Sequence, residues 1–357
     1  MNTADPASRP TMRGVFLPGK RRIDWVDKAV PTAGHGQVLL RMRASSICGS
    51  DIRAIYREHL GHGPEAYQGV IAGHEPSGEV VSVGPGCRRL GVGDRVAVYH
   101  IAGCGLCANC QAGYMIGCHD RSRAAYGWQR DGGHAAYLLA EEVTCLRLPD
   151  SLSFVDGASA ACSAGTAYEA LLRIAVGGRD RLLVTGLGPV GLAVALLARG
   201  VGVRTIVGTD PSPERRALAD RLDLLTSALP GDATAADVQD AAGGPVETSI
   251  DASGSAEGRA LALAALADFG RCAFVGEGGT VTFEPSPALI HRQVTLVGSW
   301  VTSLGHMAEL LERLDRWAIH PESLVTDRFP LAEAEAAYAL ADRGVAGKVC
   351  LVMDETT

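Results

Sequence analysis

One stretch of the sequence decides the fold of this chain: residues 182–199, LLVTGLGPVGLAVALLAR. The apolar run Leu182–Thr185 predicts a strand, and the longer Ala/Leu-rich run Val190–Arg199 predicts a helix. The glycine-rich segment Gly186–Gly191 between them predicts a tight turn. Although this stretch is the most apolar of the chain, it is short for a membrane span and is interrupted by three glycines and a proline. A strand, a turn and a buried helix therefore explain it best.

Outward from that turn, strands alternate with Ala/Leu-rich helices between residues 164 and 303. We expect further strands at Thr205–Thr209, Val246–Asp251, Cys272–Gly276 and Thr295–Gly298, and helices at Pro213–Leu222 and Ala256–Leu266. This rhythm predicts an α/β domain of the Rossmann type, with a doubly wound parallel sheet. We expect the polar segment Ala228–Thr234 to be only a surface loop.

The two ends of the chain have a different character. Before residue 164, alternating or β-branched runs bounded by glycine predict a mainly β domain, a barrel or a sandwich; they are Val38–Arg43, Gly78–Val83 and Asp94–Tyr99. After residue 303 we expect helices at Met307–Trp317 and Leu331–Asp342 and a last strand at Lys348–Val352. This last part is too small to fold alone, so we expect it to pack on the N-terminal domain. Residues 1–163 and 304–357 then form one domain, and residues 164–303 the other.

Composition excludes several classes of function. The chain has 357 residues, enough for two domains, and its net charge of −7 without a long Lys/Arg run argues against nucleic-acid binding. The first twelve residues are polar, so we expect no signal peptide, no membrane partner and a cytoplasmic location. In that reducing compartment, clusters among the ten cysteines indicate metal more often than disulfides.

Four of these cysteines lie within fifteen residues, with the spacing C-x2-C-x2-C-x7-C: Cys104, Cys107, Cys110 and Cys118. Four thiolates around Zn²⁺ leave no open position, so such a site stabilises a loop and performs no chemistry. The surrounding segment is rich in glycine and poor in apolar residues, so a metal would replace the core that it lacks. An iron–sulfur cluster and unliganded thiols are the alternatives.

The glycine turn predicts a dinucleotide site. Its residues Gly186, Gly188, Pro189, Val190 and Gly191 lie between a strand and a helix, where free backbone N–H groups can hold a pyrophosphate. Asp210 follows the next predicted strand. Its carboxylate can accept hydrogen bonds from both ribose hydroxyls and would repel a 2′-phosphate, which favours NAD over NADP. Arg215 and Arg216 are the counter-evidence, since they could hold a phosphate; Arg215 could also stack on adenine.

A second group of metal-ligand residue types is scattered along the chain: Cys48, the pair His74-Glu75, and Cys162. Spacing alone cannot join these residues. Two thiolates and a neutral imidazole would make a neutral Zn²⁺ site with one free position for water or an alcohol oxygen, as catalytic zinc requires.

Several motifs together resemble the zinc-containing medium-chain dehydrogenase/reductase family, which includes alcohol, polyol and threonine dehydrogenases. The resemblance runs from about residue 13 to near the end of the chain, and it depends on Cys48-Gly49-Ser50-Asp51, Gly73-His74-Glu75, the four-cysteine segment, Gly93-Asp94-Arg95-Val96, the GLGPVG turn and Gly347-Lys348-Val349. It implies a GroES-like catalytic domain beside the Rossmann domain, two zinc ions per chain, and a homodimer or homotetramer.

The resemblance also implies roles for individual residues. Cys48, His74 and Cys162 are the expected ligands of the catalytic zinc, with Glu75 approaching the metal when substrate is absent. Ser50 is expected to take the proton of the alcohol and Asp51 to orient His74. Lys348 is expected to contact the cofactor.

Two departures qualify the resemblance. Many alcohol dehydrogenases of this family carry a proton-relay histidine three residues after the equivalent of Ser50, but this chain has Arg53. Polyol members often use a glutamate as the downstream ligand, where this chain has Cys162. Candidates for the lining of the cleft between the domains are Trp128, Trp300 and four polar residues of the segment Ile55–Gly69: His59, His62, Glu65 and Tyr67.

We therefore expect a zinc-dependent oxidoreductase that transfers hydride between an alcohol or ketone and NAD. The substrate class that we expect is a secondary alcohol, a polyol or a cyclitol. Two alternatives remain open: a zinc-free quinone or enoyl reductase that uses NADPH, and a non-enzymatic zinc-binding or redox-sensor protein that kept the fold.

Overall fold

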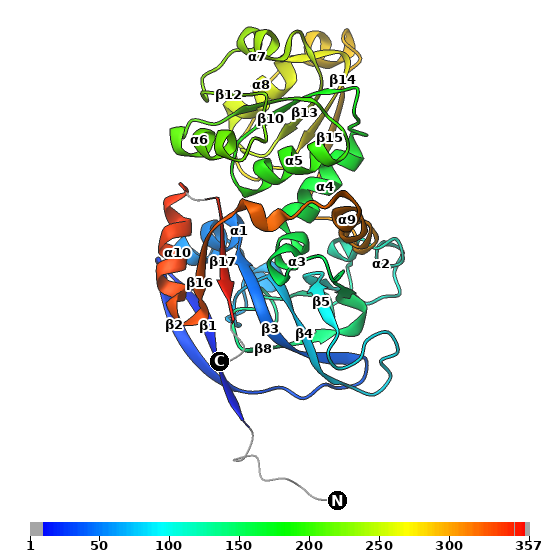
Figure 1. The fold of residues 1–357 in the computed structure, drawn as a ribbon, viewed down its shortest axis with the longest axis vertical. Coiled ribbons are helices and arrows are strands. Elements are labelled where there is room, and N and C mark those ends of the chain that lie inside the picture. The colour runs from blue at the N-terminus through cyan, green and yellow to red at the C-terminus, as the bar shows by residue number, and fades with distance from the viewer. Residues whose placement is uncertain (1–9, 346, 354–357) are drawn as a thin grey trace, which may run out of the picture.

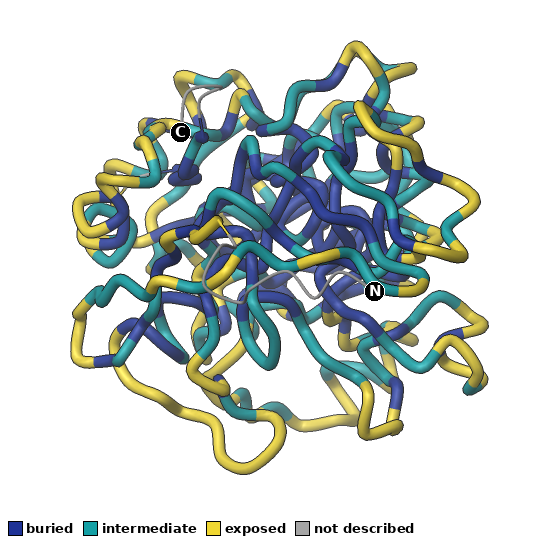
Figure 2. Tube along the Cα trace, turned by 90° about the horizontal axis from the view of Figure 1, so that it is seen from below, coloured by how far each residue is buried: buried dark blue, intermediate teal, exposed yellow. Residues whose placement is uncertain are grey.

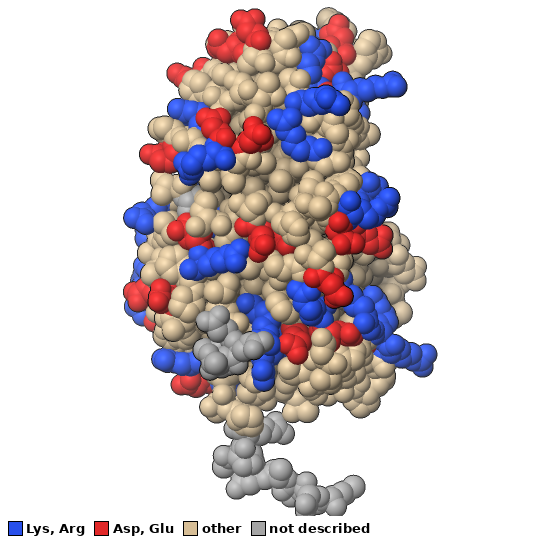
Figure 3. All heavy atoms as spheres, in the orientation of Figure 1, with Lys and Arg blue, Asp and Glu red and all other residues tan. Residues whose placement is uncertain are grey.

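The computed structural model describes residues 10–345 and 347–353; most of the expected polar N-terminal arm lies outside them. The two largest sheets lie one above the other in Figure 1, with helices α4 (Ser163–Arg173) and α9 (Leu304–Trp317) between them. Figure 2 shows the buried segments in the middle of the trace and the exposed ones at its rim. On the face drawn in Figure 3, acidic and basic side chains are mixed.

The upper sheet is parallel and has six strands. In spatial order they are β12 (Ser227–Leu229), β11 (Thr205–Thr209), β10 (Arg181–Thr185), β13 (Val246–Asp251), β14 (Leu266–Phe274) and β15 (Thr295–Gly298). Its connecting helices are α5 (Pro189–Gly200), α6 (Pro213–Arg221), α7 (Ala235–Ala242) and α8 (Ala256–Ala264). The predicted doubly wound parallel sheet is confirmed.

Both faces of this sheet are buried, as its continuous apolar strands require. Leu182 and Val184 of β10 join the core formed with α4 and α5, while Leu183 joins the core formed with α7 and α8. Part of the expected loop Ala228–Thr234 is instead the edge strand β12, which forms by pairing with β11 although its three residues carry no clear apolar pattern. The expected helix over Ala256–Leu266 ends at Ala264, because Leu266 already pairs with Val246 as the first residue of β14.

The lower sheet combines the two ends of the chain, as expected. Its strands are β16 (Val325–Pro330), β17 (Lys348–Val352), β3 (Gln37–Ile47), β4 (Glu75–Val83), β5 (Arg95–Val98) and β9 (Cys145–Arg147), with β8 (Tyr137–Glu141) paired to β3. The last strand, β17, runs antiparallel to β3. The prediction that Lys348–Val352 packs against the N-terminal strands is therefore confirmed.

Shorter elements complete this part of the chain. They are the hairpin of β1 (Thr11–Gly19) and β2 (Arg22–Ala29), the pair β6 (Ile101–Ala102) and β7 (Ala124–Ala125), and the helices α1 (Gly49–Asp51), η2 (Ile52–Arg57), α2 (Ala108–Gln111), α3 (Phe154–Ala161) and α10 (Ala334–Arg343). Among the described residues, no helix has both the length and the apolar character that a membrane crossing needs.

Candidate functional site

Strand pairing brings the scattered metal-ligand residues together. Cys48 follows the end of β3 and His74 precedes β4, and the antiparallel register pairs Ser46 with Glu75 at this edge of the sheet. Cys162 lies at the break between α3 and α4, and α3 packs on the same two strands. As a result, ligand atoms of Cys48, His74, Glu75 and Cys162 all lie within 4.8 Å of one another.

The donor set fits a zinc ion. The two sulfurs of Cys48 and Cys162 are 4.0 Å apart, close to the separation of about 3.8 Å that two Zn–S bonds at a tetrahedral angle would give. Their contact, helped by the charge of Lys348, lowers the pKa of Cys48 well below its usual value, against the effect of burial. Thiolate and imidazole are the ligands that zinc prefers, so these residues can hold it.

Asp51 orients two of these residues. Its Oδ1 lies 2.8 Å from Nδ1 of His74, and its Oδ2 accepts a hydrogen bond of 2.9 Å from the backbone N–H of Cys48. Burial acts to lower the pKa of His74, but the Asp51 carboxylate and Cys48 together outweigh it and raise the pKa well above its usual value. Because Nδ1 of His74 is occupied by Asp51, its Nε2 is left for a metal.

Glu75 forms a buried ion pair that the sequence did not reveal. Nζ of Lys348 donates a hydrogen bond of 2.6 Å to Oε1 of Glu75, and both side chains are at most 2% exposed. Burial raises the pKa of Glu75 to about 7, although the Lys348 ammonium acts in the opposite direction. Oε2 of Glu75 is buried without a hydrogen-bond partner among the described residues, which supports a cation at this position. Lys348, expected at the cofactor, thus has its ion-pair partner in the metal-ligand group.

The second metal-ligand group is local. The sulfurs of Cys104, Cys107, Cys110 and Cys118 lie within 4.8 Å of one another, and those of Cys104 and Cys110 are 4.0 Å apart. Backbone N–H groups of Leu106 and Cys107 donate to the sulfur of Cys104 and lower its pKa to about 7. Four converging sulfurs, with the Cys104 thiolate stabilised by backbone donors, fit a closed zinc site.

The glycine turn has the expected geometry. Gly186 has φ = +89°, and a Cβ on Gly191 would lie only 1.8 Å from the carbonyl oxygen of Gly186, so a side chain at either position would distort the turn. Pro189 opens α5, where its missing N–H costs nothing. The carboxylate of Asp210 is 1% exposed and accepts hydrogen bonds of 2.8 Å from the N–H groups of Leu187 and Ser212, which places it beside the turn.

The two arginines after Asp210 are differently engaged. Nη1 of Arg215 lies 3.3 Å from Oδ2 of Asp210, and its Nε donates to the carbonyl oxygen of Gly344 at 2.8 Å. The Arg216 guanidinium donates to the backbone carbonyl oxygens of Asp210 and Pro211. Both guanidinium groups therefore already have acceptors.

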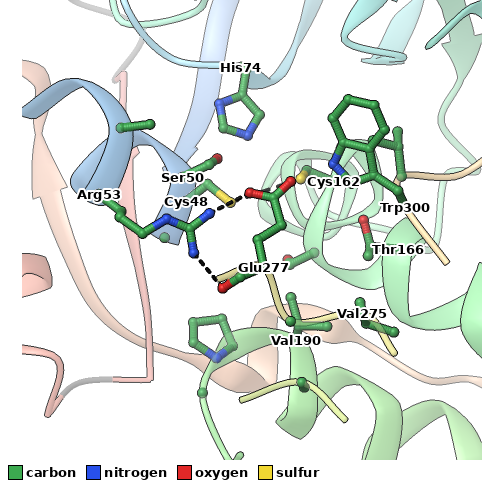
Figure 4. Close-up of a pocket in the computed structure, with 18 of the residues that line it drawn as sticks. Cys48, Ser50, Arg53, His74, Cys162, Thr166, Val190, Val275, Glu277 and Trp300 are labelled. Atoms are coloured by element: carbon green, nitrogen blue, oxygen red, sulfur yellow. Dashed lines mark hydrogen bonds and ion pairs between the residues drawn. The ribbon is translucent and has the colours of Figure 1, made fainter. Parts of the chain in front are cut away.

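One cavity of about 930 Å³ connects the two ends of the site. At one end it is lined by Cys48, Ser50, His74, Cys162 and Lys348, and at the other by Gly186, Gly188, Pro189, Val190, Asp210 and Arg215. Figure 4 shows Cys48, His74 and Cys162 on one side of this space and Val190 and Val275 on the other. The volume suits a cofactor together with a small substrate.

Other residues line the cavity between these ends. Trp128 and Trp300 do so, and of the four polar candidates in the segment Ile55–Gly69 the described lining includes Glu65; Arg57 of the same segment also lines the cavity. Tyr67 is instead buried, and its hydroxyl donates to the carbonyl oxygen of Val70.

The sequence analysis missed Glu277, which lines the cavity and pairs with Arg53. A signal for Glu277 was present, since it follows a predicted strand of a parallel sheet, and binding residues gather at such carboxyl ends.

Comparisons with known proteins agree with this geometry. Residues 34–150 match the model of the alcohol dehydrogenase GroES-like domain, and residues 189–316 match that of zinc-binding dehydrogenases. The chain is 47% identical over 352 residues to an uncharacterized zinc-type alcohol dehydrogenase-like protein, YphC, of Escherichia coli K12 (96% of this chain, 98% of the relative). It is 32% identical to an L-threonine 3-dehydrogenase of Streptomyces coelicolor (91% of this chain, 94% of the relative).

Among solved structures, the alcohol dehydrogenase TADH from Thermus sp. ATN1 matches with a TM-score of 0.86 and 27% identity, over 96% of this chain and 100% of the other. The lower sheet therefore belongs to a GroES-like domain and the upper sheet to a Rossmann domain. By its domains, its metal-ligand groups and its relatives, this chain is a member of the zinc-containing medium-chain dehydrogenase/reductase family.

Proposed function

We propose that the chain is a zinc-dependent alcohol dehydrogenase that uses NAD⁺ and oxidises a secondary alcohol, a polyol or a cyclitol. The observation that carries the proposal is one cavity with a metal-ligand group at one end and a glycine turn beside a buried carboxylate at the other. The catalytic domain would comprise residues 1–163 and 304–357, and the NAD-binding domain residues 164–303. We expect a cytoplasmic homodimer or homotetramer.

Cys48, His74 and Cys162 would hold the catalytic zinc, with Glu75 as a further ligand. Bound there, zinc supplies a Lewis acid that lowers the pKa of an alcohol oxygen. Asp51 keeps His74 in one tautomer, through the 2.8 Å contact at Nδ1. Lys348 neutralises Glu75 and so limits the negative charge that the two thiolates and the carboxylate bring together.

The glycine turn and the start of α5 would hold the pyrophosphate of the cofactor, whose nicotinamide accepts the hydride. Asp210 would face the ribose hydroxyls. A 2′-phosphate would meet this buried carboxylate and suffer like-charge repulsion, while the guanidinium groups of Arg215 and Arg216 are occupied by acceptors within the chain. These contacts support NAD over NADP.

Ser50 would take the proton of the alcohol, since its side chain lines the cavity beside Cys48. The next side chain on that helical face is Arg53, which keeps its proton at ordinary pH and so cannot relay one as histidine does. We therefore propose that the proton passes from Ser50 to water in the cavity.

A substrate panel tests the proposal. Simple secondary alcohols, polyols, cyclitols and amino alcohols are mixed with NAD⁺ and the zinc-loaded protein, and the formation of NADH is followed by its absorbance. We expect turnover of at least one alcohol, lost when the metal is removed and restored by zinc. No turnover of any alcohol, with both zinc sites shown by metal analysis to be filled, would refute the proposed function.

A further inference from the structure

An ion pair crosses the cavity between its two ends. Arg53 lies on η2, three residues after Ser50, and Glu277 lies three residues beyond the end of β14. Nη2 of Arg53 donates a hydrogen bond to Oε2 of Glu277, and Nη1 donates one of 2.9 Å to the backbone carbonyl oxygen of Glu277. In Figure 4 both side chains point into the cavity, between Cys48 and Cys162 on one side and Val190 and Val275 on the other.

The pair contributes little to stability, so its position is the informative feature. The two side chains are 42% and 47% exposed, and ion pairs in contact with water typically stabilise a protein by about 0–1 kcal/mol. Among the described residues, Oε1 of Glu277 and Nε of Arg53 have no hydrogen-bond partner, and both residues line the cavity. An acceptor and a donor are thus left for a ligand even while the pair is intact.

The combination of an acceptor and a donor suits an uncharged group that both donates and accepts hydrogen bonds, such as a hydroxyl. A carboxylate only accepts hydrogen bonds and a guanidinium only donates them, whereas a hydroxyl does both. A hydroxyl can therefore bind Glu277 and Arg53 together. A phosphate or carboxylate group would be attracted by Arg53 but repelled by Glu277, and an amine would experience the reverse. The pair favours an uncharged, hydroxyl-bearing ligand over an ionic one.

We propose that Arg53 and Glu277 form a specificity-determining pair that binds a hydroxyl next to the carbon being oxidised, so that the substrate is an uncharged polyol or cyclitol. This proposal rests on the proposed alcohol oxidation at the same site. Trp300 lines the same cavity and is 58% exposed. Its indole offers an apolar surface for the C–H groups of such a substrate, as the hydroxyls point to the charged pair.

Two substrates that differ by one hydroxyl test the pair: cyclohexanol and 1,2-cyclohexanediol. Wild type should show a kcat/KM about 10- to 100-fold higher for the diol, the range expected for a hydrogen bond to a charged group. Glu277→Leu should remove this preference, mainly by raising KM for the diol, so that the ratio of kcat/KM for the diol to that for cyclohexanol falls to about one. Glu277→Gln should recover part of the preference, because the amide oxygen still accepts a hydrogen bond.

A matched control separates the pair's role from the loss of any surface ion pair. Glu309 and Arg313 form a pair on α9 with side chains 38% and 41% exposed, and neither lines the cavity. Glu309→Leu should leave the ratio of diol to cyclohexanol unchanged. Binding of the diol in the presence of NADH, followed by tryptophan fluorescence, gives a second measure because Trp128 and Trp300 line the cavity.

Three outcomes would overturn the pair's role while the alcohol dehydrogenase function stands. In the first, wild type oxidises cyclohexanol but does not prefer the diol. In the second, Glu277→Leu lowers kcat/KM equally for both alcohols or mainly raises KM for NAD⁺. The pair would then be a contact for domain closure or for the cofactor. In the third, the wild-type enzyme prefers a zwitterionic hydroxy amino acid to the diol, and the Glu277→Leu variant loses that preference. If no alcohol is oxidised at all, the proposed function fails first.

Discussion

The two metal-ligand groups differ in how they are built. The four cysteines between Cys104 and Cys118 come from one short segment, whereas Cys48, His74, Glu75 and Cys162 come from three segments joined by strand pairing and helix packing. Among the described residues, Cys48, His74 and Cys162 of the second group line the cavity, and buried charges, including Asp51 and Lys348, lie beside them. The same kind of thiolate group therefore occurs both within a local loop and beside the cavity, and its surroundings distinguish the two cases.

The cysteine segment also has its own anchor to the rest of the chain. The buried carboxylate of Glu169, on α4, accepts a hydrogen bond of 2.7 Å from the hydroxyl of Tyr114, inside that segment. It also lies 2.7 Å from Nδ1 of His306 on α9. This anchor ties the segment to the helices between the two sheets, which is what a structural role requires.

The largest expected effect comes from removing a ligand from the metal-ligand group of Cys48, His74, Glu75 and Cys162, which is called the open group below because it lines the cavity. Cys48→Ala should lower kcat/KM for an alcohol by about 10⁴-fold, because the substrate oxygen loses its Lewis acid. The metal content should fall from two zinc ions per chain to one, measured by elemental analysis, with the circular dichroism spectrum retained. Loss of both metals, or of neither, would contradict the division into two independent sites.

Removing a ligand from the four-cysteine group, called the closed group below, should lower stability and leave the chemistry unchanged. Cys107→Ser should lower the free energy of unfolding by about 3 kcal/mol, because a closed site contributes metal-binding energy directly to folding. Thermal unfolding should show this drop while activity per folded molecule stays close to wild type. Unchanged stability together with lost turnover would show that the segment is not structural.

The contact between Asp51 and His74 distinguishes the two metal-ligand groups, because the four-cysteine group contains no histidine for a carboxylate to orient. Asp51→Asn should lower activity or zinc affinity at the open site by about 10- to 100-fold, the usual cost of removing the partner of a metal-bound histidine. Zinc titration with a chelator and steady-state kinetics measure the two effects. The zinc at the four cysteines should keep its affinity, and a parallel loss there would indicate global unfolding instead.

The smallest expected effect lies outside both metal-ligand groups. Asp210→Ser should shift the ratio of kcat/KM for NAD⁺ to that for NADP⁺ by about tenfold toward NADP⁺, because the like-charge repulsion is removed. Zinc content should stay at two ions per chain. If wild type already prefers NADP⁺, or if the ratio does not move, Asp210 does not face the ribose and the cofactor proposal must be reversed.

Local patterns predicted much of this protein. The strand, turn and helix over residues 182–199 are correct within a residue or two, because glycine sterics and apolar runs act between near neighbours. The edge strand β12 and the start of β14 were missed for the opposite reason, since each forms by pairing with a distant strand.

The sequence alone determined the parallel α/β domain, the glycine turn and the convergence of the four cysteines, because each depends on residues close together in the chain. Only the tertiary structure decided that Cys48, His74 and Cys162 meet, that Lys348 pairs with Glu75, and that Arg53 crosses the cavity to Glu277. Cys48 and His74 are 26 positions apart in the sequence, and the other contacts join residues more than 80 positions apart. Their geometry follows from strand register and from the packing of two domains, which no local pattern encodes.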